Sequence, residues 1–291
     1  LIILVITVLY SVQVVMPMKE VAGSIAMISS GDFNETMQIT GYSEAEDISD
    51  KFNSMLSVLQ NLEDARQEFV SNVSHELKTP ITSVKVLAES LIGQENVPVE
   101  LYQEFMVDIN EELERMNKII NDLLTLVKMD KNASEVNISE VNINEFLEAI
   151  LKQLQPIADK RNIEMIFESV RSVTAQVDEV KLAMAFRNLI ENAIKYNYDN
   201  GWVRVSLNAD HKFFYLKVSD SGVGIPEELQ DSIFERFYRV DKARSRETGG
   251  NGLGLAITRN AILLHRGSIK VHSIEQQGTT FAVRIPLMYS E

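Results

Sequence analysis

Apolar residues recur at intervals of three and four through the first half of the chain, which predicts long amphipathic helices. One run steps in heptads from Ile48 to Val73 and is broken only at Arg66, so it predicts a coiled helix that continues toward residue 92. After a predicted turn over 93–98, a second long helix should return antiparallel to the first. Because a lone hairpin of this kind leaves an apolar stripe exposed, we predict a homodimer built around a four-helix bundle.

The pattern changes at residue 143, beyond a polar stretch that we interpret as a linker. We predict helices over 143–155, 179–195 and 253–265, and strands over 163–169, 202–209, 213–219, 268–273 and 279–285. These elements do not alternate regularly, which argues against a Rossmann domain. They favour an α+β sandwich in which helices cover one face of a mostly antiparallel sheet. The predicted fold class is therefore multidomain, an all-α coiled-coil and four-helix dimer region followed by that sandwich.

The first 16 residues carry no charge, and the run is shorter than a full membrane span. We expect it to be the C-terminal part of a transmembrane helix, and the core of a signal peptide and a buried helix remain alternatives. The chain begins with Leu rather than Met, so we expect a fragment of a longer protein.

Composition narrows the classes of function. The net charge of −14 argues against nucleic acid as a partner, because phosphate backbones require a basic face. The absence of cysteine excludes disulfides and thiolate metal sites. The length of 291 residues leaves room for two or three domains.

His75 is followed directly by Glu76 and lies two residues from Val73 and from Leu77. Two helical steps place its imidazole about 200° from the apolar face, so it should point to solvent. An exposed imidazole beside a carboxylate is a candidate nucleophile, because the acid can take the ring proton. The alternative is an ordinary surface histidine. A zinc site of the H-E-x-x-H type is excluded, because the fifth position is Thr79.

The second half of the chain holds three clusters of candidate binding residues. Asn188, Asn192 and Lys195 share one helix face and suit Mg²⁺ and phosphates, although such a stripe alone is usually a solvated surface. Asp220 ends a strand ahead of a glycine loop, where its carboxylate could accept a hydrogen bond from an amine such as that of adenine. The alternative there is an ordinary turn.

The third cluster is the glycine-rich stretch 249–255, which opens a helix and forms a candidate anion site. It is not a P-loop, because no Gly-Lys-Ser/Thr follows. The charged stretch before it, Asp241–Glu247, is expected to be a mobile lid. Cations from this region could reach phosphates, namely Arg239, Lys242, Arg244 and Arg246.

Taken in chain order, these motifs resemble those of bacterial sensor histidine kinases. The matching stretches are the His75 helix, the Asn188–Asn192 cluster, Asp220–Gly224, Ile233–Arg239, the loop 249–255 and Gly278–Phe281. The resemblance implies a GHKL-type ATP-binding domain and a HisKA-type phosphoacceptor hairpin. The domains it implies are a transmembrane segment over 1–16, a HAMP-like linker over 17–66, the dimerisation and phosphotransfer hairpin over 67–130, a linker over 131–142 and the catalytic domain over 143–291. A plain dimeric coiled coil is the alternative to the HAMP-like linker, which lacks the usual glycine.

The resemblance also implies roles for individual residues. His75 accepts phosphate from ATP, Glu76 orients and deprotonates the imidazole, and Thr79 positions water for a phosphatase reaction. Mg²⁺ is held by Asn188 and Asn192. Nucleotide contacts are implied for Asn188, Asn192, Lys195, Tyr196, Asp220, Gly222, Gly224, Ile225, Tyr238, Arg239, Gly250, Gly252, Leu253, Gly254, Leu255 and Thr280. Asn251 departs from the usual Thr or Ser, yet it can still cap the following helix.

The same resemblance implies a partner and a location. The phosphoryl group passes to an aspartate of a response regulator receiver domain. The protein is anchored in the bacterial cell membrane, with its kinase domains in the cytoplasm. A gyrase- or Hsp90-type ATPase is a weaker alternative, because the resemblance implies that those enzymes carry a water-activating Glu where this chain has Asn188. A catalytically silent scaffold would be expected to lose His75, Asn192 or Asp220, and all three are present.

Overall fold

The computed structural model describes residues 2–11, 15, 19, 43–93, 97–131, 136–240 and 250–289. Most of the expected HAMP-like linker before residue 43 and the expected lid, with Lys242, Arg244 and Arg246, lie outside the described residues. The chain divides into two compact units, residues 1–75 and residues 76–291, which are described separately.

The first unit contains α1 (Ile2–Tyr10) and the beginning of α3 (Ser43–Ile92). None of the helices in the described part of the chain combines the length and the apolar character that crossing a membrane requires. Of the predicted heptad positions, Met55 and Leu62 remain more than half exposed in the single chain. The heptad run therefore lies within one unbroken helix, as predicted, and presents apolar side chains to its surroundings.

The second unit begins within α3, which contains Pro80 and continues past it to Ile92. The proline does not end the helix, although it removes one backbone donor. The elements that follow are α4 (Val99–Lys131), β1 (Ser139–Asn142), α5 (Ile143–Asp159), β2 (Glu164–Ser169), β3 (Thr174–Val177), α6 (Glu179–Lys195), β4 (Trp202–Ala209), β5 (Phe213–Asp220), the 3₁₀ turns Glu227–Leu229 and Ser232–Phe234, α8 (Gly254–Leu264), β6 (Ser268–Ile274) and β7 (Gly278–Pro286).

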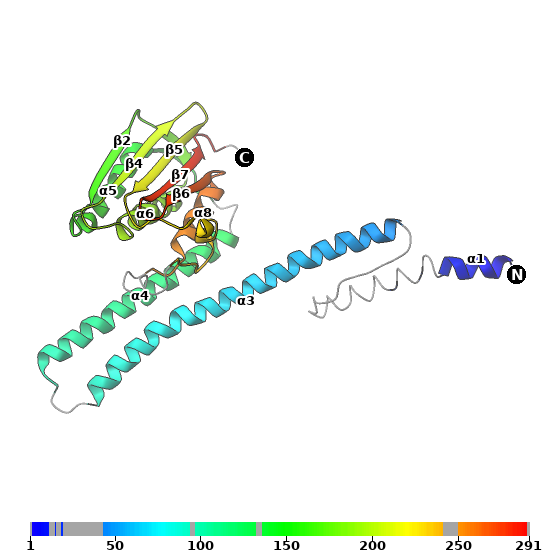
Figure 1. Cartoon of the computed structure of the whole chain (residues 1–291), viewed down its shortest axis with the longest axis horizontal. Coiled ribbons are helices and arrows are strands. Elements are labelled where there is room, and N and C mark those ends of the chain that lie inside the picture. Colours follow the sequence, from blue (N-terminus) through cyan, green and yellow to red (C-terminus); the bar gives the residue numbers. More distant parts are fainter. Residues whose placement is uncertain are drawn as a thin grey trace. The chain divides into compact units, whose positions relative to one another are not determined.

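The main sheet has five strands in the order β2-β4-β5-β7-β6. The β2–β4 pair is parallel and the other three pairs are antiparallel. Helices α5, α6 and α8 cover one face of this sheet (Figure 1). The predicted α+β sandwich is therefore confirmed.

Alternation along the central strands builds the core of this domain. In β5, Phe214, Leu216 and Val218 are fully buried, whereas the intervening residues are more exposed. The neighbouring strand β4 buries residues on the same face of the sheet, and its Leu207 pairs with Leu216 of β5. Each such side chain contributes roughly 1.5–3 kcal/mol by its removal from water. This packing holds β5 in place, and β5 ends at the candidate binding residue Asp220.

One part of the predicted linker was wrong. Residues 139–142, assigned to a polar linker, form β1, which pairs antiparallel with β3 in a separate two-stranded sheet. The two strands are four residues each, and of β1 only Val141 is buried. So few apolar positions give no period that a sequence reading can detect, and the pairing depends on backbone hydrogen bonds.

Candidate functional site

Helix α6 is fixed at its N-terminus by contacts from distant parts of the chain. The side chain of Asp178 caps the helix by accepting the backbone N–H of Lys181 at 3.0 Å. The backbone N–H of Asp178 in turn donates to Nε2 of His265 at 2.9 Å. Burial lowers the pKa of His265, which keeps the imidazole neutral and able to accept. His265 therefore has a structural role at the start of α6.

The side chain of Asn188 on α6 contacts the glycine-rich loop. Its Nδ2 donates to the carbonyl oxygen of Gly254 at 2.7 Å. A Cβ added at Gly254 would lie 2.8 Å from both polar atoms of that amide. Glycine is therefore required for this approach.

Lys195 extends the same face of α6 to the start of the glycine-rich loop. A Cβ at Gly250 would lie 2.7 Å from its Nζ, and the ammonium lies 5.1 Å from the centre of the Tyr196 ring. Burial lowers the pKa of Lys195 to about 8, and the nearby positive charges of Lys118 and Arg239 act in the same direction. Asn192, half-buried, lies between these two contacts on the helix. Several positive charges close together attract an anion, so this region favours the binding of one.

Asp220 ends β5 as a buried carboxylate, 8% exposed. Its Oδ1 accepts the backbone N–H groups of Gly222 at 2.9 Å and Thr279 at 3.2 Å. Burial raises the pKa of Asp220 to about 6, and these two hydrogen bonds oppose the rise. A Cβ at Gly222 would meet the carbonyl oxygen of Tyr196 at 2.3 Å, so the loop lies directly against the end of α6.

The loop after Asp220 is also bound to the last hairpin of the sheet. Gly278 has a φ of +112°, and a Cβ there would lie 2.0 Å from the carbonyl oxygen of Asp220. The backbone N–H of Ile225 donates to Oγ of Ser273 at 2.8 Å. Thr280, in β7, donates its hydroxyl to Ser219 at 2.9 Å. The final predicted motif therefore lies beside the Asp220 loop.

Asn251 organises the glycine-rich loop. Its Oδ1 accepts the backbone N–H of Leu253 at 3.1 Å, within the loop. The predicted capping role is wrong, because Leu253 is the N-cap of α8 and no side chain caps that helix. Its Nδ2 donates to Asp122 of α4 at 2.7 Å, and burial raises the pKa of that carboxyl. Gly252 has a φ of +70° and packs against the backbone of Phe237. Asp122 was not predicted, because it is 129 residues away and belongs to no binding motif.

The α3 residues assigned to chemistry lie on its surface. His75 and Thr79 are exposed, one helical turn apart. The carboxylate of Glu76 lies 3.4 Å from the guanidinium of Arg239, so the structure brings together two predicted site residues that are 163 positions apart. Tyr238, beside Arg239, is half-buried.

Two family models match separate parts of the chain. The His Kinase A (phospho-acceptor) domain model matches residues 65–132. The model described as histidine kinase-, DNA gyrase B-, and HSP90-like ATPase matches residues 177–288. Each model covers less than half of the chain, and the two matched regions resemble domains found in histidine kinases.

Two named relatives and one solved structure are similar to a larger part of the chain. Sensor protein kinase WalK of Staphylococcus aureus is 37% identical over 276 residues, which cover 92% of this chain and 64% of that protein. WalK of Staphylococcus saprophyticus subsp. saprophyticus is 37% identical over 273 residues, which cover 92% of this chain and 43% of that protein. The chain thus spans less than two thirds of the length of these relatives. The structure of histidine kinase ThkA in complex with response regulator protein TrrA shares the fold, with a TM-score of 0.63 and 24% identity over 78% of this chain and 64% of that one.

The oxygen atoms that this site offers would fit a Mg²⁺ ion that is also bound to phosphates. Because Nδ2 of Asn188 is engaged by Gly254, its Oδ1 is the atom left to accept, which is the oxygen type that Mg²⁺ prefers. Among the described residues, no group of three or more His, Cys, Asp or Glu side chains is arranged to hold a metal ion. A Mg²⁺ ion here would therefore depend on amide and phosphate oxygens.

Proposed function

We propose that this chain is the kinase portion of a bacterial sensor histidine kinase. It phosphorylates itself on His75 from Mg²⁺-ATP and passes the phosphoryl group to an aspartate of a response regulator receiver domain. The observation that carries the proposal is the convergence of Asp220, Asn188 and Lys195 around glycine loops, in a chain that also presents an exposed His75. Transfer of the γ-phosphoryl group of ATP to His75 tests it.

Each of the named residues has a separate role in the proposed reaction. A nitrogen of His75 attacks the γ-phosphorus, the bond to the ADP oxygen breaks, and Glu76 takes the ring proton. Asn188 and Asn192 hold Mg²⁺, which when bound offsets the charge of the phosphates. Lys195 and Arg239 add positive charge, and Asp220 accepts a hydrogen bond from the adenine amine. The backbone of Gly222, Gly224, Gly250, Gly252 and Gly254 and the side chains of Tyr196, Ile225, Tyr238, Leu253, Leu255 and Thr280 complete the proposed nucleotide site.

Dimerisation and membrane anchoring belong to the same proposal. The hairpin helices leave apolar side chains exposed, among them Ile81 on α3 and Leu113 and Leu124 on α4. A second copy would bury them in a four-helix bundle. The uncharged residues 1–16 would anchor the chain in the bacterial cell membrane through a HAMP-like linker, with the kinase domains in the cytoplasm.

Replacing Thr79 by Ala should sharply lower dephosphorylation of the regulator while His75 labelling stays near normal. Thr79 is exposed one turn beyond His75, where its hydroxyl can both donate to and accept from a water molecule that attacks the aspartyl phosphate. The measurement follows loss of phosphate from the purified phosphorylated regulator. Thr82→Ala is the matched control, because the Thr82 hydroxyl donates to the backbone of Lys78 on the same helix. A parallel loss of labelling and dephosphorylation would leave Thr79 with only a helical role.

Insertions near Gln60 should alter kinase output according to their length. Because α3 is continuous from Ser43 to Ile92, one added residue turns the helix beyond it by roughly 100°, whereas seven nearly restore the register. Autophosphorylation measured for inserts of one to seven residues should therefore vary and recover at seven. Output that ignores insert length would mean that rotation is not transmitted along α3.

A further inference from the structure

The short segment between α6 and β4 connects the two halves of the proposed nucleotide site. Asn197, 1% exposed, accepts the hydroxyl of Ser221 at 3.0 Å and donates to the carbonyl oxygen of Trp202 at 2.9 Å. The carbonyl oxygen of Tyr196 accepts the backbone N–H of Val223 at 3.1 Å. The loop that follows Asp220 is therefore bonded directly to the residues that end α6.

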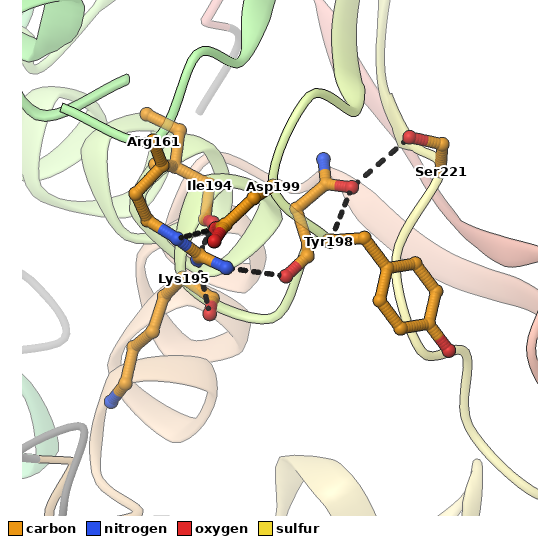
Figure 2. Close-up of polar contacts among 7 residues, drawn as sticks. Arg161, Ile194, Lys195, Tyr198, Asp199 and Ser221 are labelled. Carbon is orange, nitrogen blue, oxygen red and sulfur yellow. Dashed lines mark hydrogen bonds and ion pairs between the residues drawn. The ribbon is translucent and has the colours of Figure 1, made fainter. Parts of the chain in front are cut away.

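Arg161, in the turn between α5 and β2, holds this segment in place. Its Nη1 donates to the carbonyl oxygens of Ile194 at 2.7 Å and Lys195 at 2.9 Å, and its Nη2 donates to that of Asn197 at 2.7 Å. Its Nε donates to Asp199 at 2.9 Å. Figure 2 shows the guanidinium at the centre of these contacts, with the side chain of Lys195 extending away from it.

These contacts match what the end of a helix lacks. The last carbonyl groups of a helix lack the usual partners one turn further on, and a cation there is favoured by the helix dipole. In α6 the carbonyl of Ile194 accepts a long hydrogen bond, at 3.4 Å, from the backbone N–H of Asn197. A guanidinium presents five donors in a fixed plane, so one side chain can bind three carbonyl groups and a carboxylate at once. A lysine ammonium offers no such plane, so it cannot reproduce the set.

We propose that Arg161 is a positioning residue for nucleotide binding. It sets the end of α6, which carries Lys195, and through Asn197 and Ser221 it sets the loop that carries Asp220. Both groups must keep their relative position to bind the phosphates and the base of one ligand. This inference rests on the proposed nucleotide-binding function, and in it Arg161 acts through the residues that it positions.

The test is the affinity for ADP of the whole 291-residue chain, measured by calorimetry well below the melting temperature. Arg161→Met keeps the apolar stem and removes every donor, and it should raise the Kd about tenfold, as expected when two binding groups lose their alignment. Asn144→Ala is the matched control. Asn144 makes three hydrogen bonds, with Ser169, Arg171 and Val173, so the variant loses a similar number of bonds elsewhere in the domain. Its Kd should stay within about twofold of the wild type.

The tryptophan supplies a local signal that a general loss of stability would not change. Trp202 is the single tryptophan of the chain, its backbone N–H donates to Ser221 and its carbonyl accepts from Asn197. Quenching of its fluorescence by acrylamide should increase in Arg161→Met and remain unchanged in Asn144→Ala. Asp199→Asn removes only an exposed ion pair, since that carboxylate is 70% exposed, and should change neither reading.

The outcomes separate this inference from the proposed function. A wild-type chain that does not bind ADP contradicts the proposed function itself. A wild-type chain that binds ADP, with Arg161→Met binding equally well, contradicts the role of Arg161 alone, and so does equal weakening in Asn144→Ala. If Arg161→Met does not fold, Arg161→Lys carries the comparison, and it should show an intermediate Kd because one ammonium replaces a subset of the bonds.

Discussion

Replacement of His75 by Gln is expected to abolish the incorporation of phosphate from Mg²⁺-ATP while the affinity for ADP stays unchanged. An amide has no ring nitrogen that can form the P–N bond, so the loss should be complete rather than graded. Because His75 is exposed on α3 and the nucleotide residues lie between α6, β5 and α8, the substitution should leave the binding site intact. Labelling with γ-³²P-ATP, with the label labile in acid and stable in base, measures the first effect, and calorimetry with ADP measures the second.

The controls for His75 come from the other histidines. His211 and His272 are exposed in the second unit, so His211→Gln and His272→Gln should retain full labelling. Label that persists in His75→Gln would remove His75 as the acceptor. Label lost in either control would mean that the assay reports the integrity of the domain rather than the acceptor.

Asp220→Asn is expected to weaken ADP binding while stabilising the free protein. The carboxylate accepts one charged hydrogen bond from the adenine amine, and its loss should weaken binding by on the order of 1.5–3 kcal/mol, or roughly tenfold to a hundredfold. Calorimetry with ADP at pH 7 measures this. An unchanged affinity would remove Asp220 from base recognition.

The gain in stability follows from the raised pKa of Asp220. In the folded protein this pKa is about 6, above its ordinary value of 3.8, so the folded state holds a proton that the unfolded chain has already released. The stabilising effect of that proton is lost as the pH rises from about 3.8 through 6, and at pH 7 the buried charge lowers the free energy of unfolding by roughly 3 kcal/mol. Asn carries no charge, so the variant should gain on the order of 1–3 kcal/mol at pH 7, measured by urea denaturation.

A matched control lies in the turn that precedes β5. Asp210 accepts the backbone N–H groups of Lys212 and Phe213 and the hydroxyl of Tyr215, and these hydrogen bonds lower its pKa to about 2. Asp210→Asn should therefore lower stability at pH 7, the opposite of Asp220→Asn, and leave ADP affinity unchanged. For the wild type, ADP affinity should also fall as the pH drops below about 6, where Asp220 becomes protonated. That dependence should disappear in Asp220→Asn.

Helices and strands in which apolar residues recur regularly over many positions could be predicted from the sequence. The helix predicted over 179–195 has those bounds in the structure, because Asp178 caps it and seven buried residues repeat along one face. Strands β4 and β5 were predicted from their alternation. The two short strands β1 and β3 were not predicted. Each has only four residues, and they pair through backbone hydrogen bonds with a distant segment, so neither offers a pattern long enough to recognise.

The residues of the proposed nucleotide site were predicted from motifs, whereas the residues that support them were not. Asn188, Lys195 and Asp220 were recognised from their spacing, and the structure adds the close approaches that explain the neighbouring glycines. Arg161 gave no signal, because a single arginine in a turn is common and its partners are backbone carbonyls that any residue would supply. Contacts with backbone carbonyls are set by the tertiary fold and not by residue type, so a sequence motif cannot reveal them.

The attachment of α6 at both ends has a consequence for the thermodynamics of binding. The residue that caps its N-terminus is hydrogen-bonded to His265, and its C-terminus is hydrogen-bonded to Arg161, so both ends of the helix are held by contacts that need no ligand. A ligand that binds an ordered helix does not reduce the conformational entropy of that helix any further. The entropy lost on nucleotide binding should therefore arise from the ligand and from segments outside α6, and the contacts made by the helix should contribute almost their full enthalpy to affinity.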